Sequence, residues 1–168
     1  MVDVLVLCTG NAARSVMAAT SLSARRPDLV VATAGTLVVD GQPMSVRTRA
    51  AIEGVGHPVP RHASRQVHPP DLDAATLVVA LAPEHVEWVR RTHDPAAART
   101  LTLRRLVRDL PPGDRLTDQV AAMRPHEIEL EPWEEVVDPG GGEADVFAEC
   151  AREIDRLVHD LAPRLGRS

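Results

Sequence analysis

A short apolar strand that turns directly into a helix is the feature that most limits how this chain can fold. Residues 2–7 are mostly apolar (VDVLVL) and predict a buried strand. Gly10 and Asn11 interrupt the apolar run, and residues suited to a helix begin at Arg14. Because a helix start has unpaired N–H groups and the positive end of the helix dipole, this tight connection predicts an anion-binding site.

Cys8 stands at the end of the predicted strand, at the floor of that site. The positive surroundings and the guanidinium of Arg14 both favour a thiolate, and the planar guanidinium matches two oxygens of a tetrahedral oxyanion. Ser15 can donate its hydroxyl to the sulfur, and Asn11 tolerates a left-handed backbone. A lone Cys on a strand is usually a buried structural thiol. The surrounding Gly, Asn and Arg-Ser favour instead a nucleophile beneath a phosphate-like group.

The segment Cys8 to Ala18 (CTGNAARSVMA) resembles the catalytic loop of low molecular weight protein tyrosine phosphatases and of the arsenate reductases that share their fold. The likeness continues at Thr33–Thr36, at Arg61–Val67 and at Asp138-Pro139, so it spans nearly the whole chain. The resemblance implies a phosphate-binding loop made of consecutive residues after the nucleophile: Thr9, Gly10, Asn11, Ala12, Ala13, Arg14 and Ser15.

The resemblance also implies residues that hold this loop in shape. In the family, a hydroxyl residue at the end of the second strand and a later His hydrogen-bond the loop Asn, which here implies Thr33, His62 and Asn11, with Ser15 as a further support. Judged without the resemblance, His62 is a solvated loop residue. The other histidines have no metal-ligand spacing and are predicted at the solvated surface: His57, His68, His85, His93, His126 and His159.

Asp138 is the candidate for proton transfer. Breaking a phosphate ester expels an oxyanion, and an acid within hydrogen-bond reach of the leaving group lowers that barrier. Asp before Pro is also common in ordinary turns. By the resemblance, Asp138 is the general acid and base, and it completes the catalytic set with Cys8 and Arg14.

The remaining pattern predicts an α/β fold, a single domain over residues 1–168 with a four-stranded parallel sheet, helices on both faces and the phosphate-binding loop after the first strand. Strands are predicted at 2–7, 29–34, 77–81 and 100–103, and helices at 15–26, 45–54, 83–92 and 143–165. Cys150 falls on the apolar stripe of the last helix, which predicts a core thiol. Residues 106–137 are poorly patterned, with a helical turn or two at 116–123.

Composition excludes several classes of protein. The chain has 168 residues, 44% of them hydrophobic, and no apolar run of membrane length, which predicts a soluble domain. The formal net charge of −5 argues against general nucleic-acid binding. Two cysteines give neither a disulfide framework nor a CxxC metal motif, and the N-terminus has no signal-peptide pattern. We therefore expect a cytoplasmic monomer or weak dimer with no cofactor, metal, nucleic-acid or membrane partner.

Three functions follow from these observations. The first is a phosphomonoester hydrolase, similar to protein tyrosine phosphatases, that acts on a phosphorylated protein or a small phosphomonoester through a phosphocysteine intermediate. The second is an arsenate reductase that uses an external small thiol, since residues 77–91 hold none of the cysteines of an internal relay. A non-enzymatic anion-binding module ranks last, because nucleophile, guanidinium and acid are all present.

The chain departs from phosphotyrosine-selective members of the family at the pocket walls. Where those members place aromatic residues, this chain has Leu37–Val39 and Gly140–Gly142, and it contains no Tyr, one Phe and two Trp. We therefore expect weak binding of aryl rings. Ala13 also replaces a second loop Cys that many members carry beside the loop Arg.

Overall fold

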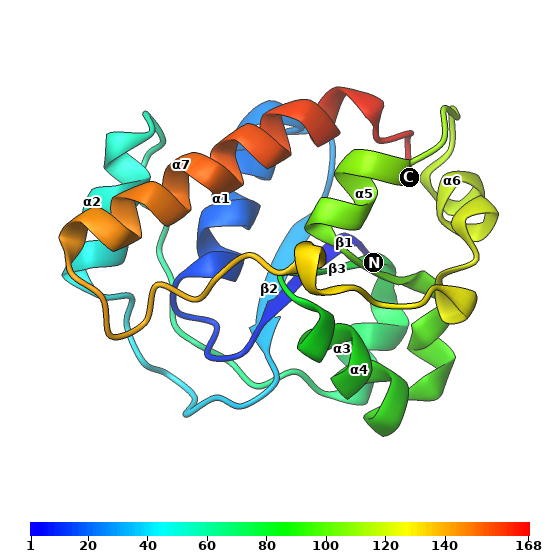
Figure 1. Cartoon of the computed structure of the whole chain (residues 1–168), viewed down its shortest axis with the longest axis horizontal. Helices are drawn as coiled ribbons and strands as arrows, with labels where there is room; N and C mark the ends of the chain where they lie inside the picture. The colour runs from blue at the N-terminus through cyan, green and yellow to red at the C-terminus, as the bar shows by residue number, and fades with distance from the viewer.

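A sheet of four parallel strands lies at the centre of the protein, in the order β2-β1-β3-β4 (Figure 1). The strands are β1 (Val2–Cys8), β2 (Val31–Gly35), β3 (Ala75–Ala80) and β4 (Thr100–Thr102). This computed structural model describes all residues from 1 to 168. The fold class predicted from the sequence is confirmed. Because β1 is flanked by β2 and β3 on its two edges, the loop after β1 begins in the middle of the carboxyl edge of the sheet.

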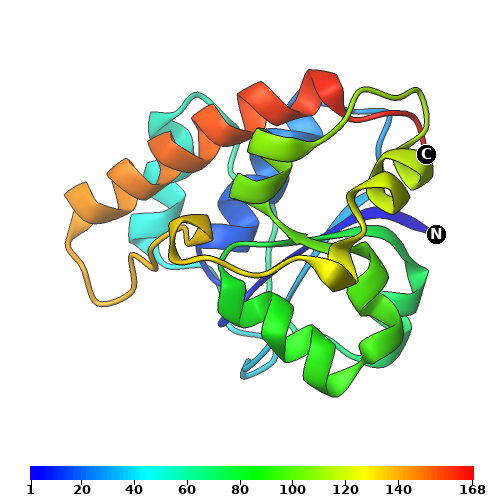
Figure 2. The same ribbon diagram turned by 45° about the vertical axis from the view of Figure 1, so that its right-hand side comes forward.

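The side chains of β1 alternate between two hydrophobic cores. Val4, Val6 and Cys8 face the larger core, and Leu5 and Leu7 face the smaller one. Helices α1 (Arg14–Arg25), α2 (Val46–Gly54), α5 (Leu103–Asp109), α6 (Leu116–Met123) and α7 (Ala144–Leu161) contribute to the larger core. Helices α3 (Pro69–Ala74) and α4 (Pro83–Thr92) cover the other face, below the sheet in Figures 1 and 2.

Most of the predicted elements are present, with shifted ends. The last helix stops at Leu161 rather than 165, and a 3₁₀ turn follows at Ala162–Arg164. Its apolar stripe is buried as predicted, and Cys150 is a core thiol that is only 7% exposed. Two short helices, α3 and α5, were not predicted, because six or seven residues give too little of a helical period to recognise.

The poorly patterned segment before α7 is anchored by a buried carboxylate. It contains α6 and 3₁₀ turns at Pro125–Glu127 and Pro132–Glu134. Glu134 accepts hydrogen bonds from Arg105 Nη2 at 2.5 Å and from Thr102 Oγ1 at 2.6 Å. Burial favours a raised pKa for Glu134, but these bonds outweigh it and lower the pKa. The carboxylate therefore stays ionised and ties the segment to the end of β4.

No helix of the protein combines the length and the apolar character needed to cross a lipid bilayer.

Candidate active site

The loop between β1 and α1 leaves a row of main-chain donors unused. The N–H groups of residues 10–15 donate to no protein acceptor, and the first bond of the helix runs from Met17 N to Ala13 O. Ala13, the N-cap residue of α1, offers no side-chain cap. Unpaired N–H groups at a helix start attract anions. The loop thus has the donors that a tetrahedral oxyanion requires, at the place the sequence predicts.

Asn11 is the residue on which the loop turns. Its φ of 51° lies in the left-handed region, and its side chain is fully buried. The amide Nδ2 donates to Ser15 Oγ over 3.0 Å, and Oδ1 accepts the N–H of Arg65 at 3.0 Å. The Asn11 carbonyl accepts from His62 Nε2 at 2.6 Å and from Ser64 Oγ at 3.2 Å. These bonds hold a backbone conformation that would otherwise be costly.

Thr33 does not take the place that the resemblance implied for it. No hydrogen bond joins Thr33 to Asn11, and its side chain lines a separate groove between α1 and residues 58–62. The reason is its position in β2, where Thr33 pairs with Val6, two residues before the level of Cys8. Ser64, which the sequence analysis did not single out, provides the hydroxyl instead.

Gly35 lets the second strand pass close to the loop. A Cβ at this position would lie 2.4 Å from the carbonyl oxygen of Thr9 and 2.9 Å from the main-chain nitrogen of Asn11. Because both neighbours are backbone atoms, neither can rotate away. The close approach allows Thr36 N to donate to Cys8 O at 3.0 Å and Leu37 N to donate to Thr9 O at 3.1 Å.

The Cys8 sulfur lies against the first turn of α1. Its Sγ is 3.1 Å from Ser15 Oγ, and both side chains are buried. As a thiol, Cys8 donates to this oxygen; once the thiol ionises, the Ser15 hydroxyl can turn and donate to sulfur. Asn11 Nδ2 already donates to the same oxygen. In the thiolate state the Asn11 bond therefore leaves the hydroxyl hydrogen free to point towards the sulfur.

Arg14 connects the loop to the segment that carries Asp138. The guanidinium is 3% exposed, and its Nη1 donates to the carbonyl of Val136 over 2.9 Å. Nη2 is 3.6 Å from Asp138 Oδ2, whose side chain is 59% exposed. The other carboxyl oxygen, Oδ1, accepts the N–H of Gly140 at 2.9 Å. The loop that carries the predicted nucleophile and guanidinium is thus brought beside the distant segment that carries the predicted acid.

A histidine that the sequence analysis placed at the surface is buried beside the loop. His85, on α4, is 1% exposed, and its Nε2 lies 2.9 Å from Thr9 Oγ1. Burial, with Arg14 adding to it and Asp138 opposing, lowers the pKa of His85 to about 3. The surface prediction is therefore wrong for His85. It is also wrong for His57 and His93, which are partly buried against Asp155 and Asp73 respectively.

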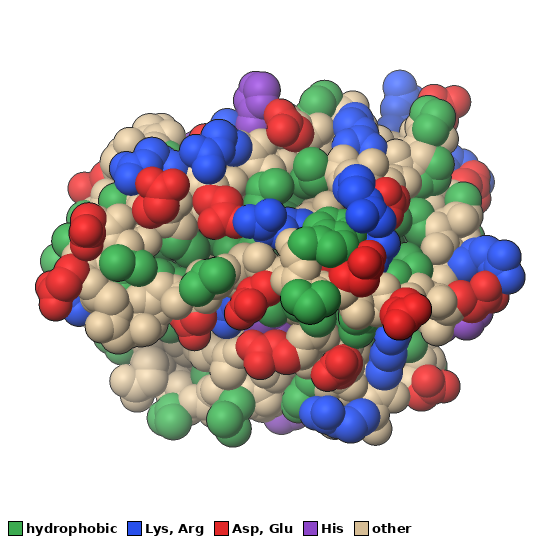
Figure 3. Space-filling view, viewed as in Figure 1, with side chains coloured by type: hydrophobic (Ala, Val, Ile, Leu, Met, Phe, Trp, Pro, Cys, Tyr) green, Lys and Arg blue, Asp and Glu red, His purple; other side chains and the backbone are tan.

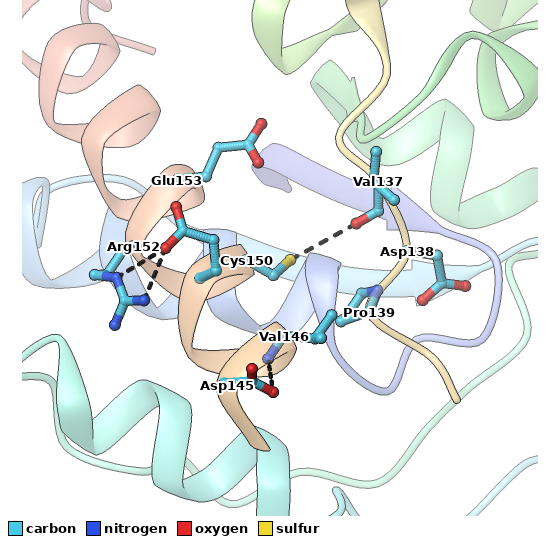
Figure 4. A pocket seen from close by; sticks show the side chains of 9 residues that line it. Val137, Asp138, Pro139, Asp145, Val146, Cys150, Arg152 and Glu153 are labelled. Carbon is cyan, nitrogen blue, oxygen red and sulfur yellow. Dashed lines mark hydrogen bonds and ion pairs between the residues drawn. The ribbon is translucent and has the colours of Figure 1, made fainter. Parts of the chain in front are cut away.

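An acidic groove of about 440 Å³ opens beside Asp138. In Figure 4, Cys150 on α7 and Asp138 on the preceding segment border the same groove. Acidic side chains gather over the N-terminal half of α7, at the left of Figure 3. The charged residues that line the groove are four acids and one base: Asp138, Asp145, Glu149, Glu153 and Arg152.

Cys150 is a poor competitor for the role of nucleophile. Burial raises the pKa of its thiol to about 12, and the nearby Glu153, Asp138 and Cys8 add to the shift while Arg14 opposes it. Cys150 is therefore a neutral thiol at neutral pH, and a thiol reacts far more slowly than a thiolate. Cys8 remains as the sulfur placed beneath the unpaired N–H groups.

A family model described as low molecular weight phosphotyrosine protein phosphatase matches residues 3–168. The chain belongs to this family. The recognition made from its loop and from the later segments is confirmed, and the protein is a cysteine-dependent phosphatase.

The similar proteins include phosphatases named for arginine and phosphatases named for tyrosine. The protein-arginine-phosphatase of Geobacillus stearothermophilus is 28% identical over 163 residues, which cover 96% of this chain and 95% of the relative. The solved structure of YwlE arginine phosphatase from the same organism has a TM-score of 0.77 at 26% identity and covers 97% of this chain and 92% of that one. The structure of the tyrosine phosphatase AmsI of Erwinia amylovora has a TM-score of 0.77 at 20% identity. The match covers 99% of this chain and 95% of that one.

This family member has no aromatic side chain beside Asp138. No aromatic residue lines the groove beside Asp138. Trp133 lies under the guanidinium groups of Arg105 and Arg108, 4.8 Å and 4.1 Å from its ring centre, and Phe147 is buried in the larger core. Trp88 packs against the smaller core on the far face of the sheet. All three aromatic side chains are thus committed elsewhere.

Proposed function

We propose that this phosphatase uses Cys8 as the nucleophile, Arg14 and the N–H groups of residues 10–15 as the oxyanion site, and Asp138 as general acid and base. The observation that carries the proposal is the unpaired row of loop donors above a sulfur that is hydrogen-bonded to Ser15. An oxyanion bound there meets the sulfur on one side and Asp138 on the other.

The first step is transfer of the phosphoryl group to sulfur. The Cys8 thiolate attacks phosphorus, an S–P bond forms, and the bond from phosphorus to the leaving atom breaks. Protonated Asp138 gives its proton to the leaving atom, so the alcohol of a phosphate ester departs neutral and the guanidine of phosphoarginine departs as a guanidinium. The Arg14 fork and the loop N–H groups stabilise the charge on the equatorial oxygens, where donors held in advance are most effective.

The second step regenerates the thiolate. Asp138, now a carboxylate, takes a proton from water as the water attacks phosphorus. The S–P bond breaks, inorganic phosphate forms, and the Ser15 hydroxyl stabilises the departing sulfur. Neither step requires a group that the chain lacks.

We propose phosphoarginine in proteins as the preferred substrate. Three observations support this choice: the similarity to an arginine phosphatase along almost the whole chain, the lack of an aromatic wall for a phosphotyrosine ring, and the acidic groove beside Asp138. When the P–N bond breaks, the leaving group becomes a guanidinium. A carboxylate-rich wall suits that cation. Phosphotyrosine is the second candidate, favoured by the description of the family as a whole.

Matched peptides test the substrate. One peptide sequence carrying phosphoarginine, phosphotyrosine or phosphoserine is offered to the purified protein with a chelator, and phosphate release is measured. We expect the largest kcat/KM for phosphoarginine, and a preference for phosphotyrosine would overturn the substrate assignment. Arsenate with a small thiol is assayed in parallel, because arsenite formation without any phosphate release would favour the reductase that the sequence left open.

A further inference from the structure

Thr9, the residue directly after Cys8, is held from two sides. Its carbonyl accepts the N–H of Leu37 at 3.1 Å, on the side of β2. Its hydroxyl faces α4, where Oγ1 lies 2.9 Å from His85 Nε2 and 3.5 Å from Glu84 Oε1. No other hydrogen bond links Thr9 to the face of the sheet covered by α4.

The direction of the bond between His85 and Thr9 follows from what surrounds the imidazole. His85 Nδ1 is buried and has no hydrogen-bond partner. A hydrogen on Nδ1 would be an orphaned buried donor, which is rarer and costlier than an unused acceptor. We therefore place the hydrogen on Nε2, which donates to Thr9 Oγ1. The Thr9 hydroxyl then donates in turn towards Glu84 Oε1.

The imidazole carries no charge at neutral pH, because its pKa is about 3. The charged groups that face it are Arg14, Asp138 and Glu84. Burial and Arg14 hold the pKa of His85 near 3. The ring therefore keeps a single N–H hydrogen, the one on Nε2. A fixed, neutral donor that lies behind the loop can orient Thr9 without adding a second cation beside the bound oxyanion.

We propose that His85 is a positioning residue for the nucleophile: through Thr9 it fixes the first turn of the loop and so holds the Cys8 sulfur beneath the N–H groups. The proposal rests on Cys8 being the nucleophile. It gives the loop a second histidine support, distinct from His62, which acts on the carbonyl of Asn11.

Two substitutions at His85 test the role. His85→Leu removes the donor, whereas the amide of Gln in His85→Gln can still donate near the position of Nε2. The matched control is His159→Gln, which changes an exposed histidine on α7. Two rates are measured at pH 7: turnover of p-nitrophenyl phosphate, and alkylation of Cys8 by iodoacetamide, followed by peptide mass spectrometry.

We expect His85→Leu to lower kcat and the rate of Cys8 alkylation by about tenfold to a hundredfold, because small displacements of a reacting group are costly. His85→Gln should recover most of both rates, and His159→Gln should match the wild type. Thr9→Val removes the same bond from the other side. Thr9→Val should lower both rates when it is introduced into the wild type. Introduced into His85→Leu, it should lower them little further, because the bond is already absent.

Thermal unfolding identifies variants that fail to fold, and Thr9→Val then carries the test if His85→Leu does not fold. Unchanged alkylation in a folded His85→Leu or Thr9→Val would overturn the proposal. Equal losses in His85→Gln and His85→Leu would also overturn it, since they would indicate packing rather than donation. The alkylation rate reports on the Cys8 sulfur and not on turnover. A failure of the proposed phosphatase mechanism would appear separately, as full activity in Cys8→Ser.

Discussion

Arg14 and Val136 are 122 positions apart in the chain, and the Arg14 guanidinium donates from Nη1 to the Val136 carbonyl over 2.9 Å. Val136 N in turn donates to Leu81 O at 2.8 Å, just after β3. Val136 therefore ties the Arg14 guanidinium to the sheet. Two residues later the chain reaches Asp138, so the same segment orients the guanidinium and carries the acid. Glu134, held by Arg105 and Thr102, anchors this segment.

Arg14→Lys should fold but lose activity. An ammonium keeps the charge but not the planar fork, so it cannot hold Val136 O and two oxyanion oxygens together. We expect kcat/KM to fall about 10²- to 10³-fold, the usual effect of removing one oxyanion donor. Steady-state kinetics with p-nitrophenyl phosphate measures the loss. Near-normal kcat and KM in this variant would remove Arg14 from the oxyanion site.

Asp138→Asn should separate substrates by their leaving groups. An alkyl phosphate needs a proton on its departing oxygen, and its hydrolysis should slow about 10²- to 10⁴-fold. Nitrophenolate leaves readily without a proton, so transfer from p-nitrophenyl phosphate to the enzyme should slow little. Single-turnover rates on both substrates make the comparison. Equal losses would argue that Asp138 is not the general acid.

Gly35→Ala should damage the loop without unfolding the protein. The new methyl group would lie 2.4 Å from Thr9 O and 2.9 Å from Asn11 N, so the loop must move away from β2. We expect kcat to fall by about tenfold or more, because the reacting groups are displaced. Gly54→Ala is the control, since no atom outside its own stretch of α2 lies within 4 Å of its Cβ position. Wild-type kinetics in Gly35→Ala would contradict the close approach.

The buried His85 should make the protein sensitive to acid. The pKa of His85 is about 3 in the folded protein, whereas a histidine in the unfolded chain has its usual pKa of 6.5. Below pH 6.5 the unfolded chain therefore binds a proton that the folded chain does not. The contribution of neutral His85 to the free energy of unfolding is therefore fully present above pH 6.5, and it is lost progressively as the pH falls towards 3. Between pH 6.5 and pH 5 the loss is about 2 kcal/mol from this group.

Urea unfolding of the wild type and His85→Gln at several pH values tests that effect. At pH 7.5 the variant should be the less stable of the two, because it loses a well-packed imidazole. The difference in unfolding free energy should shrink by about 2 kcal/mol at pH 5, since Gln takes up no proton. A difference that stays constant with pH would mean that His85 is not a buried neutral base.

Much of the fold could be predicted from local patterns. The run of residues 2–7, the break at Gly10 and the apolar stripe of α7 each reflect a physical constraint that lies within a few residues of sequence. The same holds for the loop itself, since Cys8, Asn11, Arg14 and Ser15 are joined by their spacing on a strand-to-helix turn.

Partners supplied by distant segments could not be predicted in this way. His85 looked like a surface residue because one polar residue among Glu84, Val86 and Glu87 gives no sign of burial. In the fold its Nε2 lies 2.9 Å from Thr9 Oγ1, in a loop 76 positions earlier in the chain. Thr33 was expected at Asn11, but it pairs with Val6, two residues before the level of Cys8. The offset between β1 and β2 cannot be read from either strand alone.

The central claim is that Cys8 carries the phosphoryl group during turnover. The most direct test is to mix Asp138→Asn with p-nitrophenyl phosphate, stop the reaction with denaturant within the first turnovers, and locate phosphate by peptide mass spectrometry. The good leaving group allows the S–P bond to form, and the missing base slows its hydrolysis, so one phosphoryl group should accumulate on Cys8. Phosphate found on another residue would contradict the account. So would turnover that leaves Cys8 unmodified and that continues in Cys8→Ser.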